Sequence, residues 1–191
     1  RIMKFERTPI SQNDLKKIAS RFLIHGDFDL GTPYGSGHIN DTFDVHINQG
    51  GNTVRYIFQR INHGIFTNPI QLMENIARVC DHNLKTYEDL GLEERSRRVL
   101  TVIPSRDGLP YVLDSENYYW RCYIFIEKSR TYDRIENKNQ AYEAAKAFGN
   151  FQKLLSNLGG HRLHETVPDF HNTVARYRNL VAAIEADCCG R

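Results

Sequence analysis

A glycine-rich segment is the part of this sequence whose residue types and spacing best suit the binding of a phosphate group. Gly35 and Gly37 follow a segment that predicts a β-strand, 28–34, and Asn40 lies at the start of a second, 39–47. Glycine lets backbone N–H groups approach a phosphate closely, and asparagine tolerates positive φ. Because a strand follows, this segment differs from the phosphate loops that open helices. A tight hairpin without a ligand is the alternative interpretation.

The elements predicted around this segment form an ordered scaffold. They are helix 11–26, strands 28–34, 39–47 and 53–61, helix 68–87, strands 98–104, 109–113 and 118–127, connector 128–133, and helices 137–158 and about 171–186. This is the order of the small lobe of the kinase-like fold, where one helix follows the third strand of an antiparallel sheet. A generic α+β domain can share it.

We therefore predict an α+β fold with a kinase-like small lobe in residues 1–127. Its antiparallel sheet has five or six strands and one long helix. Residues 128–134 form a hinge or connector, and 135–191 form the first helices of an incomplete, mainly helical large lobe.

Composition narrows the class of protein. The chain has 191 residues, a net charge of +2, 40% hydrophobic and 25% charged residues, which is ordinary for a globular protein. The small net charge predicts no nucleic-acid partner, and the lack of an apolar run of about 20 residues predicts no membrane helix. Four cysteines without metal-type spacing and no visible signal peptide predict reduced thiols in the cytoplasm. The oligomeric state is left open.

Several motifs, in the same order along most of the chain, resemble the aminoglycoside phosphotransferase family. The closer resemblance is to the N-acetylhexosamine 1-kinases, often labelled mucin desulfatases. The motifs are Gly-Ser-Gly-His-Ile-Asn-Asp-Thr-Phe at 35–43, Phe-Gln-Arg-Ile-Asn at 58–62, Leu-Met-Glu-Asn-Ile at 72–76, Trp-Arg-Cys-Tyr-Ile-Phe-Ile-Glu at 120–127, Thr-Tyr-Asp at 131–133, Ala-Phe-Gly-Asn-Phe-Gln at 147–152 and Phe-His-Asn-Thr at 170–173.

The resemblance implies transfer of the γ-phosphoryl group of ATP, with Mg²⁺, to the anomeric hydroxyl of GlcNAc or GalNAc. Such a transfer requires that the phosphates be held and the acceptor hydroxyl be aligned. The implied partner is a small sugar, and the implied role is sugar salvage in the cytoplasm.

The resemblance also implies an ATP site on this chain. Gly35 and the backbone N–H groups of Ser36, Gly37, His38 and Asn40 would hold the β- and γ-phosphates. The alternative for His38 is a plain surface residue.

A cation on the third strand is expected over the phosphates. Alternation places Arg60 and Gln59 on opposite faces and does not settle which one faces the cleft. We expect Arg60, because a charged donor binds phosphate more strongly than an amide. Glu74 on the long helix would orient this cation through a salt bridge. The alternatives are solvent-facing positions for both charged residues.

The end of the last strand is expected to meet the adenine. Backbone groups of Phe125, Ile126 and Glu127 would pair with its edge, and the apolar side chains would lie behind it. An ordinary buried strand end is the alternative. Further along, Asp169, Asn172 and Thr173 come just before or at the start of a helix. For each of them we prefer the role of a helix cap over a catalytic role.

The catalytic motifs of the family have no counterparts in the sequence. They are a His-x-Asp-type loop, with an aspartate base and a metal-binding asparagine, and a later Asp-x-Asp that binds Mg²⁺. After Phe170 the only acidic residues are Glu185 and Asp187. We therefore expect this chain to be an N-terminal part of a kinase, without catalytic or metal residues and inactive alone.

Two alternative functions stay open. One is another small-molecule kinase of the same fold, acting on an aminoglycoside, choline or an amino-acid hydroxyl. The other is a non-catalytic nucleotide-binding or regulatory module.

Overall fold

The centre of the molecule is a six-stranded antiparallel sheet. A computed structural model describes residues 8–190. The strands are β1 (Asp27–Pro33), β2 (Asp41–Gln49), β3 (Asn52–Arg60), β4 (Val102–Ile103), β5 (Val112–Leu113) and β6 (Tyr119–Ile124). Their order is β1-β2-β3-β6-β4, and β5 also pairs with β6. The predicted α+β class with five or six antiparallel strands is confirmed.

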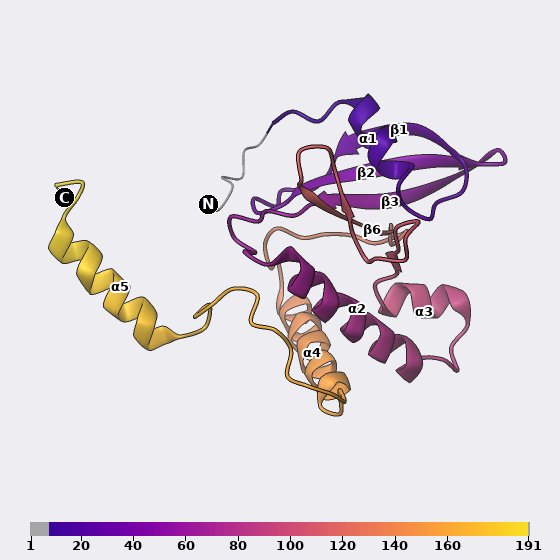
Figure 1. Cartoon of the computed structure of the whole chain (residues 1–191). Coiled ribbons are helices and arrows are strands. Elements are labelled where there is room, and N and C mark those ends of the chain that lie inside the picture. The colour runs from indigo at the N-terminus through magenta and orange to yellow at the C-terminus, as the bar shows by residue number, and fades with distance from the viewer. Residues whose placement is uncertain (1–7, 191) are drawn as a thin grey trace.

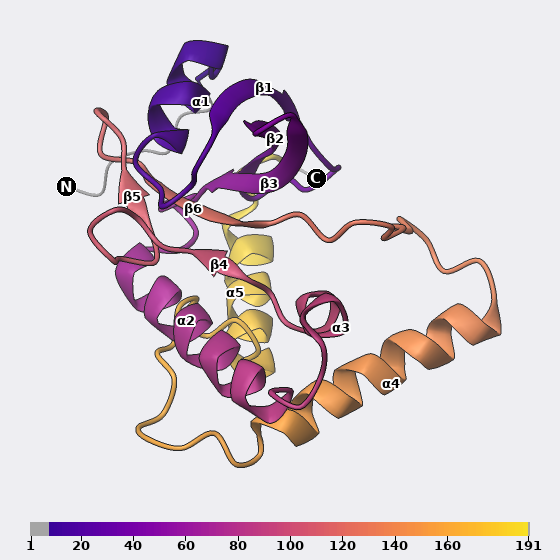
Figure 2. The same ribbon diagram turned by 90° about the vertical axis from the view of Figure 1, so that its right-hand side faces the viewer.

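Five helices accompany the sheet, and they lie on different sides of it. They are α1 (Gln12–Ala19), α2 (Pro69–Thr86), α3 (Leu92–Arg98), α4 (Lys138–Leu155) and α5 (Thr173–Ala186). Helix α1 lies on one side of the sheet, whereas α2, α3 and α4 lie on the other (Figures 1 and 2). We call these two sides the α1 face and the α2 face.

The larger hydrophobic core fills the α1 face. Alternate residues of the central strands meet Leu15, Ile18 and Phe22 there. These strand residues are Phe43, Val45, Ile47, Tyr56, Phe58, Trp120 and Cys122. A smaller core lies under α2, where Leu72 and Met73 pack against Ile61, with Tyr119 at its edge. The sheet therefore has a filled apolar face and a second face that is only partly covered.

Local sequence signals explain where the helices begin. The Ser11 hydroxyl accepts from the Asp14 N–H, and the Asp14 carboxylate accepts from the Ser11 N–H, a complete capping box at α1. The Asn68 side chain caps α2 by accepting from Gln71 N–H, and Pro69 occupies the first turn. Asn172 caps α5 by accepting from Ala175 N–H. Its expected role as a helix cap is confirmed.

The largest differences from the predicted boundaries lie at the first helix and before the fourth strand, and the strands β4, β5 and β6 are shorter than predicted. The first helix ends at Ala19 instead of residue 26, because the Leu23 N–H donates to Pro104 O and Phe22 pairs with Ser105. Residues 92–98 form α3 instead of leading into a strand from 98 to 104. Helix α3 has acidic residues in its first turn and basic residues in its last, which suits the helix dipole.

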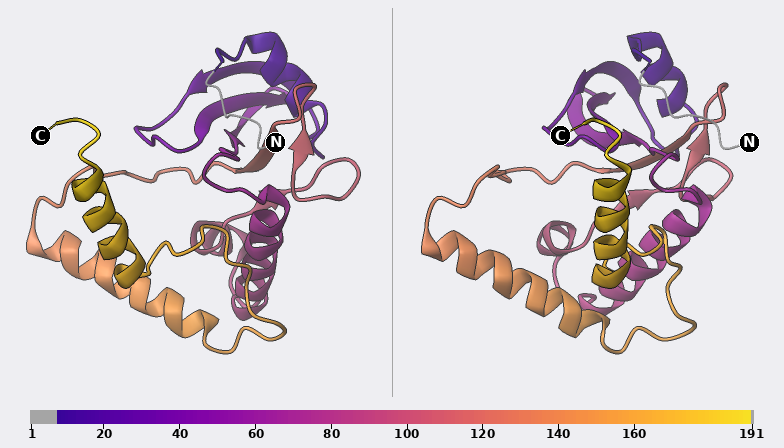
Figure 3. Two further views of the ribbon diagram at one scale, coloured as in Figure 1. Left: turned by 60° about the vertical axis from the view of Figure 1, so that its left-hand side comes forward. Right: turned by 90° about the vertical axis from the view of Figure 1, so that its left-hand side faces the viewer.

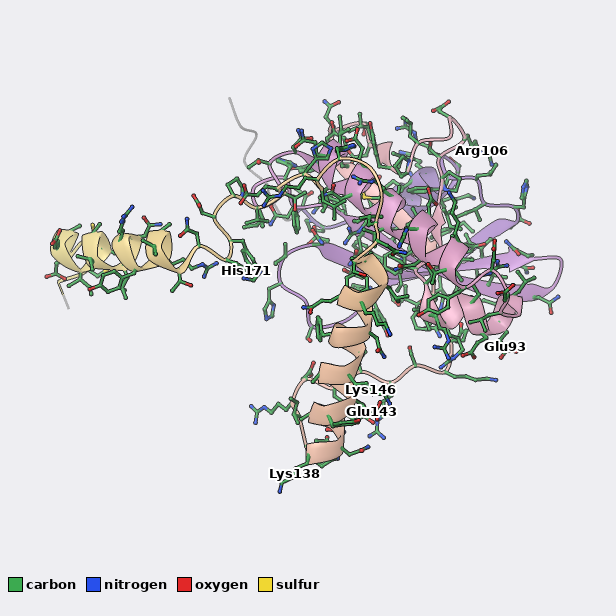
Figure 4. All side chains as sticks on the ribbon, turned by 90° about the horizontal axis from the view of Figure 1, so that it is seen from below. Glu93, Arg106, Lys138, Glu143, Lys146 and His171 are labelled. Atoms are coloured by element: carbon green, nitrogen blue, oxygen red, sulfur yellow. The ribbon has the colours of Figure 1, made fainter. Side chains whose placement is uncertain are left out.

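Helices α4 and α5 carry large apolar side chains that are exposed. These are Tyr142, Phe148 and Phe151 on α4 and Val174, Tyr177, Leu180 and Ile184 on α5. Lys138 lies at the end of α4 farthest from α2, and α5 stands apart beyond His171 (Figures 3 and 4). Neither helix has a buried residue, in contrast to the sheet and α1.

None of the helices in the described residues is long and apolar enough to cross a membrane.

One pair of substitutions compares the two environments. Phe58 is 0% exposed and Phe148 is 71% exposed. Phe58→Ala is expected to lower the free energy of unfolding by about 3–5 kcal/mol, because it leaves a cavity in the packed α1 face. Phe148→Ala is the matched control and is expected to change it by about 0.5 kcal/mol or less. Urea denaturation followed by circular dichroism measures both changes. Equal losses of unfolding free energy would contradict the conclusion that the core lies on the α1 face and not around α4.

Candidate functional site

The glycine loop joins β1 to β2 and reaches the connector that follows β6. Gly35 has φ +79°, a backbone conformation that L side chains rarely adopt. A Cβ at Gly37 would meet nothing within 4 Å, so the backbone there is open to a ligand. The Ser36 Oγ donates to the Asp133 Oδ1 at 3.1 Å. The loop and the connector, about a hundred residues apart in sequence, therefore lie against each other.

Asn40 holds the loop to the end of β3. Its side-chain Oδ1 accepts from the Asn62 N–H at 3.0 Å, and the Asn62 Nδ2 donates to the Ile39 carbonyl oxygen at 3.1 Å. His38 is exposed on the loop. A cavity of about 380 Å³ lies beside the loop, lined by Gly35, Gly37, Asn40 and Thr42 together with Thr8–Ile10, Pro33, Tyr34, Asp41 and Phe43.

Arg60 does not lie on the α2 face. Its guanidinium donates to the Asp41 Oδ2 from Nε at 2.9 Å and from Nη2 at 2.7 Å. It also donates to the Thr8 hydroxyl at 3.0 Å, and it lies 4.8 Å from the centre of the Tyr118 ring. The residue is 1% exposed. Arg60 thus stabilises the α1 side of the sheet, because alternation puts it on the same face as Phe58.

Glu74 is not paired with Arg60, contrary to the sequence prediction. Its Oε2 lies 2.9 Å from the His164 Nε2. The neighbouring Asn75 forms two hydrogen bonds with the His164 backbone. Its Nδ2 donates to the His164 carbonyl oxygen at 2.9 Å, and its Oδ1 accepts from the His164 N–H at 3.0 Å. Arg78 donates to the carbonyl oxygens of Gly159 and His161. The outward side of α2 therefore holds the segment that follows α4.

The end of β6 and the first residues of the connector join a cluster of charged and aromatic side chains. The Arg55 Nε donates to the Asp44 Oδ2 at 3.2 Å, and its Nη1 donates to the Glu127 Oε2, also at 3.2 Å. The hydrogen bond to Asp44 is the main reason that the pKa of Arg55 is raised. The Arg55 guanidinium lies 3.6 Å from the centre of the Phe125 ring, and Tyr34 meets that ring edge-on.

The backbone of the connector has both paired and unpaired groups. The Phe125 N–H donates to Arg55 O, Ile126 O accepts from Ser129 Oγ, and Glu127 O accepts from Arg97 Nη1. In the part of the chain that the structure describes, no hydrogen bond involves the Phe125 carbonyl oxygen or the Glu127 N–H. Both groups lie beyond the end of β6, and Glu127 is the first residue of a turn.

A polar row crosses three strands on the α2 face and begins at Thr42, close to the glycine loop in sequence. The Arg121 Nε donates to the Gln59 Oε1 at 2.8 Å, and the Gln59 Nε2 donates to the Thr42 Oγ1 at 2.9 Å. These side chains share one face because Thr42 pairs with Gln59 and Gln59 pairs with Arg121 across the ladders. Burial lowers the pKa of Arg121.

Sequence reasoning missed Arg121. It placed the expected cation on the third strand and weighed only Gln59 and Arg60 there. The signal that identifies Arg121 is the register between β3 and β6, which one strand alone does not contain.

Among residues 8–190 no group of three or more His, Cys, Asp or Glu side chains is arranged to hold a metal ion. The glycine loop, in contrast, suits a phosphate, because Gly37 leaves its backbone open.

No protein-family model matches the sequence.

The burial of Arg60 leads to a test of its role. Arg60→Ala removes one partner of a buried ion pair, so it is expected to lower the free energy of unfolding by about 3–5 kcal/mol. The double variant Arg60→Met/Asp41→Leu replaces both charges with apolar groups and is expected to recover much of this loss. Chemical denaturation of the two variants measures the effect. A small loss for Arg60→Ala would mean that the pair does not stabilise the α1 face.

Proposed function

We propose that this chain binds ATP and provides the nucleotide-binding half of a phosphotransferase. The observation that carries the proposal is the contact between Ser36 in the glycine loop and Asp133 in the connector. Together with the contact between the Tyr34 and Phe125 rings, it brings a loop suited to phosphates close to a strand end suited to a base. In kinase-type clamps these two parts hold opposite ends of the nucleotide.

The connector backbone supports the adenine end of the proposal. The Phe125 carbonyl oxygen accepts and the Glu127 N–H donates, and neither has a protein partner among the described residues. The edge of adenine that carries its exocyclic amine offers a donor beside an acceptor. A carbonyl oxygen and an N–H group two residues apart can pair with that edge.

The acceptor and the metal belong to the proposal through the resemblance. The motifs at 35–43, 58–62 and 120–127 are similar to those of N-acetylhexosamine 1-kinases, so we propose the anomeric hydroxyl of GlcNAc or GalNAc as the acceptor. Mg²⁺ belongs to the proposal through the resemblance alone, because among the described residues no group of three or more His, Cys, Asp or Glu side chains is arranged to hold an ion.

Gly37 gives the sharpest test of nucleotide binding. A Cβ at Gly37 and one at Gly159 would each meet nothing within 4 Å, and neither glycine has positive φ. Gly37→Val is expected to lower the affinity for ATP about tenfold or more, because its side chain occupies the space above the loop backbone. Gly159→Val, the matched control, is expected to leave the affinity unchanged. Isothermal titration calorimetry measures both. Failure of the unmodified chain to bind ATP would refute the proposal.

A second test concerns the reaction. The chain has no His-x-Asp or Asp-x-Asp motif after Phe170, so we expect it to bind ATP without releasing ADP in the presence of GlcNAc or GalNAc. A coupled ADP-release assay over a panel of sugars and amines measures this. Turnover with a hexosamine would contradict the expectation that this chain binds ATP but lacks the catalytic residues. Turnover with an amine would contradict the proposed acceptor.

A further inference from the structure

The polar row on the α2 face contains a cation, Arg121, that no carboxylate among residues 8–190 neutralises. The Arg121 Nε is bonded to the Gln59 Oε1, and among the ion pairs of the described residues none includes Arg121. Tyr123 and Cys80 interact with it electrostatically, and burial raises the pKa of both, which favours their neutral forms. The other arginines of the sheet, Arg55 and Arg60, are both paired with aspartates.

The surroundings of Arg121 make an uncompensated charge costly. The residue is partly buried between β6 and α2, and burial lowers its pKa. A guanidinium stays charged in proteins, so a partly buried one without a carboxylate suits an anionic ligand. Its planar fork matches the oxygen atoms of a phosphate.

The row also connects Arg121 to the glycine loop. Gln59 bridges Arg121 and Thr42, and Thr42 is the second residue of β2, directly after the loop. Two strand spacings, about 10 Å, separate the two ends of the row. A bound polyphosphate chain of a nucleotide can therefore contact the loop and the row together.

We propose that Arg121 on β6, and not a residue of β3, is the cation that binds the phosphate groups of the nucleotide. Gln59 takes the position on β3 where a cation was expected, and its amide fixes the orientation of the Arg121 guanidinium. This inference rests on the proposed nucleotide binding, and it assigns the phosphate contact to a particular side chain. It predicts that Arg121 acts on phosphates and not on the adenine.

The experiment compares ATP, adenosine and inorganic tripolyphosphate as ligands of the full chain. Arg121→Gln is expected to weaken ATP binding about 10- to 100-fold and to leave adenosine binding unchanged, because only the charged hydrogen bonds to phosphate are lost. Arg106→Gln, which removes the same charge from an exposed loop, is the matched control and is expected to change neither affinity. Calorimetry measures affinity, and circular dichroism verifies folding.

The outcomes separate this inference from the proposed function. Unchanged ATP affinity in a folded Arg121→Gln variant, or equal losses for ATP and adenosine, would overturn the role of Arg121 while leaving nucleotide binding intact. If ATP does not bind but tripolyphosphate raises the melting temperature of the unmodified chain and not of Arg121→Gln, the anion site stands and the nucleotide function fails. No effect of either ligand on the unmodified chain overturns both.

A conservative variant covers the case in which Arg121→Gln does not fold. Arg121→Lys keeps the charge but loses the planar fork. It is expected to lose ATP affinity severalfold while adenosine affinity is unchanged. Equal losses of ATP and adenosine affinity in Arg121→Lys would overturn the role of Arg121 in binding the phosphates.

Discussion

The pairing of β6 with its neighbours on both sides is the constraint on which the rest of the structure depends. One edge of β6 pairs with β3, and the other pairs with both β4 and β5. Its alternate side chains therefore serve two faces, with Trp120 and Cys122 in the main core and Arg121 on the opposite side. A slip of one residue would exchange them and would place a guanidinium in the apolar core.

The same alternation separates the arginines by their roles. Arg60 lies on the apolar face, where a lone charge would be very costly, and it is buried against Asp41 and Thr8. Arg121 lies on the partly covered face and is bonded to an amide instead of a carboxylate. On the α1 face a buried charge therefore needs a carboxylate partner, whereas on the α2 face the Arg121 guanidinium is available to a ligand.

The two sides of α2 contact different parts of the molecule. Leu72 and Met73 pack under the sheet, while Glu74, Asn75 and Arg78 hold residues 159–164. The long helix thus joins the sheet to the segment after α4 by polar contacts along one side. Helix α4 also meets α2, where the His82 Nε2 lies 2.9 Å from the Leu154 oxygen, whereas Phe148 and the apolar side chains of α5 stay exposed.

Much of the fold followed from the sequence by itself, because its signals are local. Strand alternation, the caps at Asn68 and Asn172 and the glycine loop between two strands each depend on neighbouring residues. These fixed the α+β class, the order of the strands along the chain and the long helix after the third strand. Residues 92–98 were missed, because acidic and basic residues without an apolar stripe do not separate a short helix from a turn.

Only the tertiary structure decided which side chains share a face of the sheet. The sequence left Gln59 and Arg60 as alternatives, because alternation within one strand gives two faces without saying what covers each. The packing of α1 against Phe58 and the register of β3 with β6 settle the matter, burying Arg60 and placing Gln59 beside Arg121. The physical reason is that a cross-strand pair joins residues 62 positions apart, and no local pattern encodes their register.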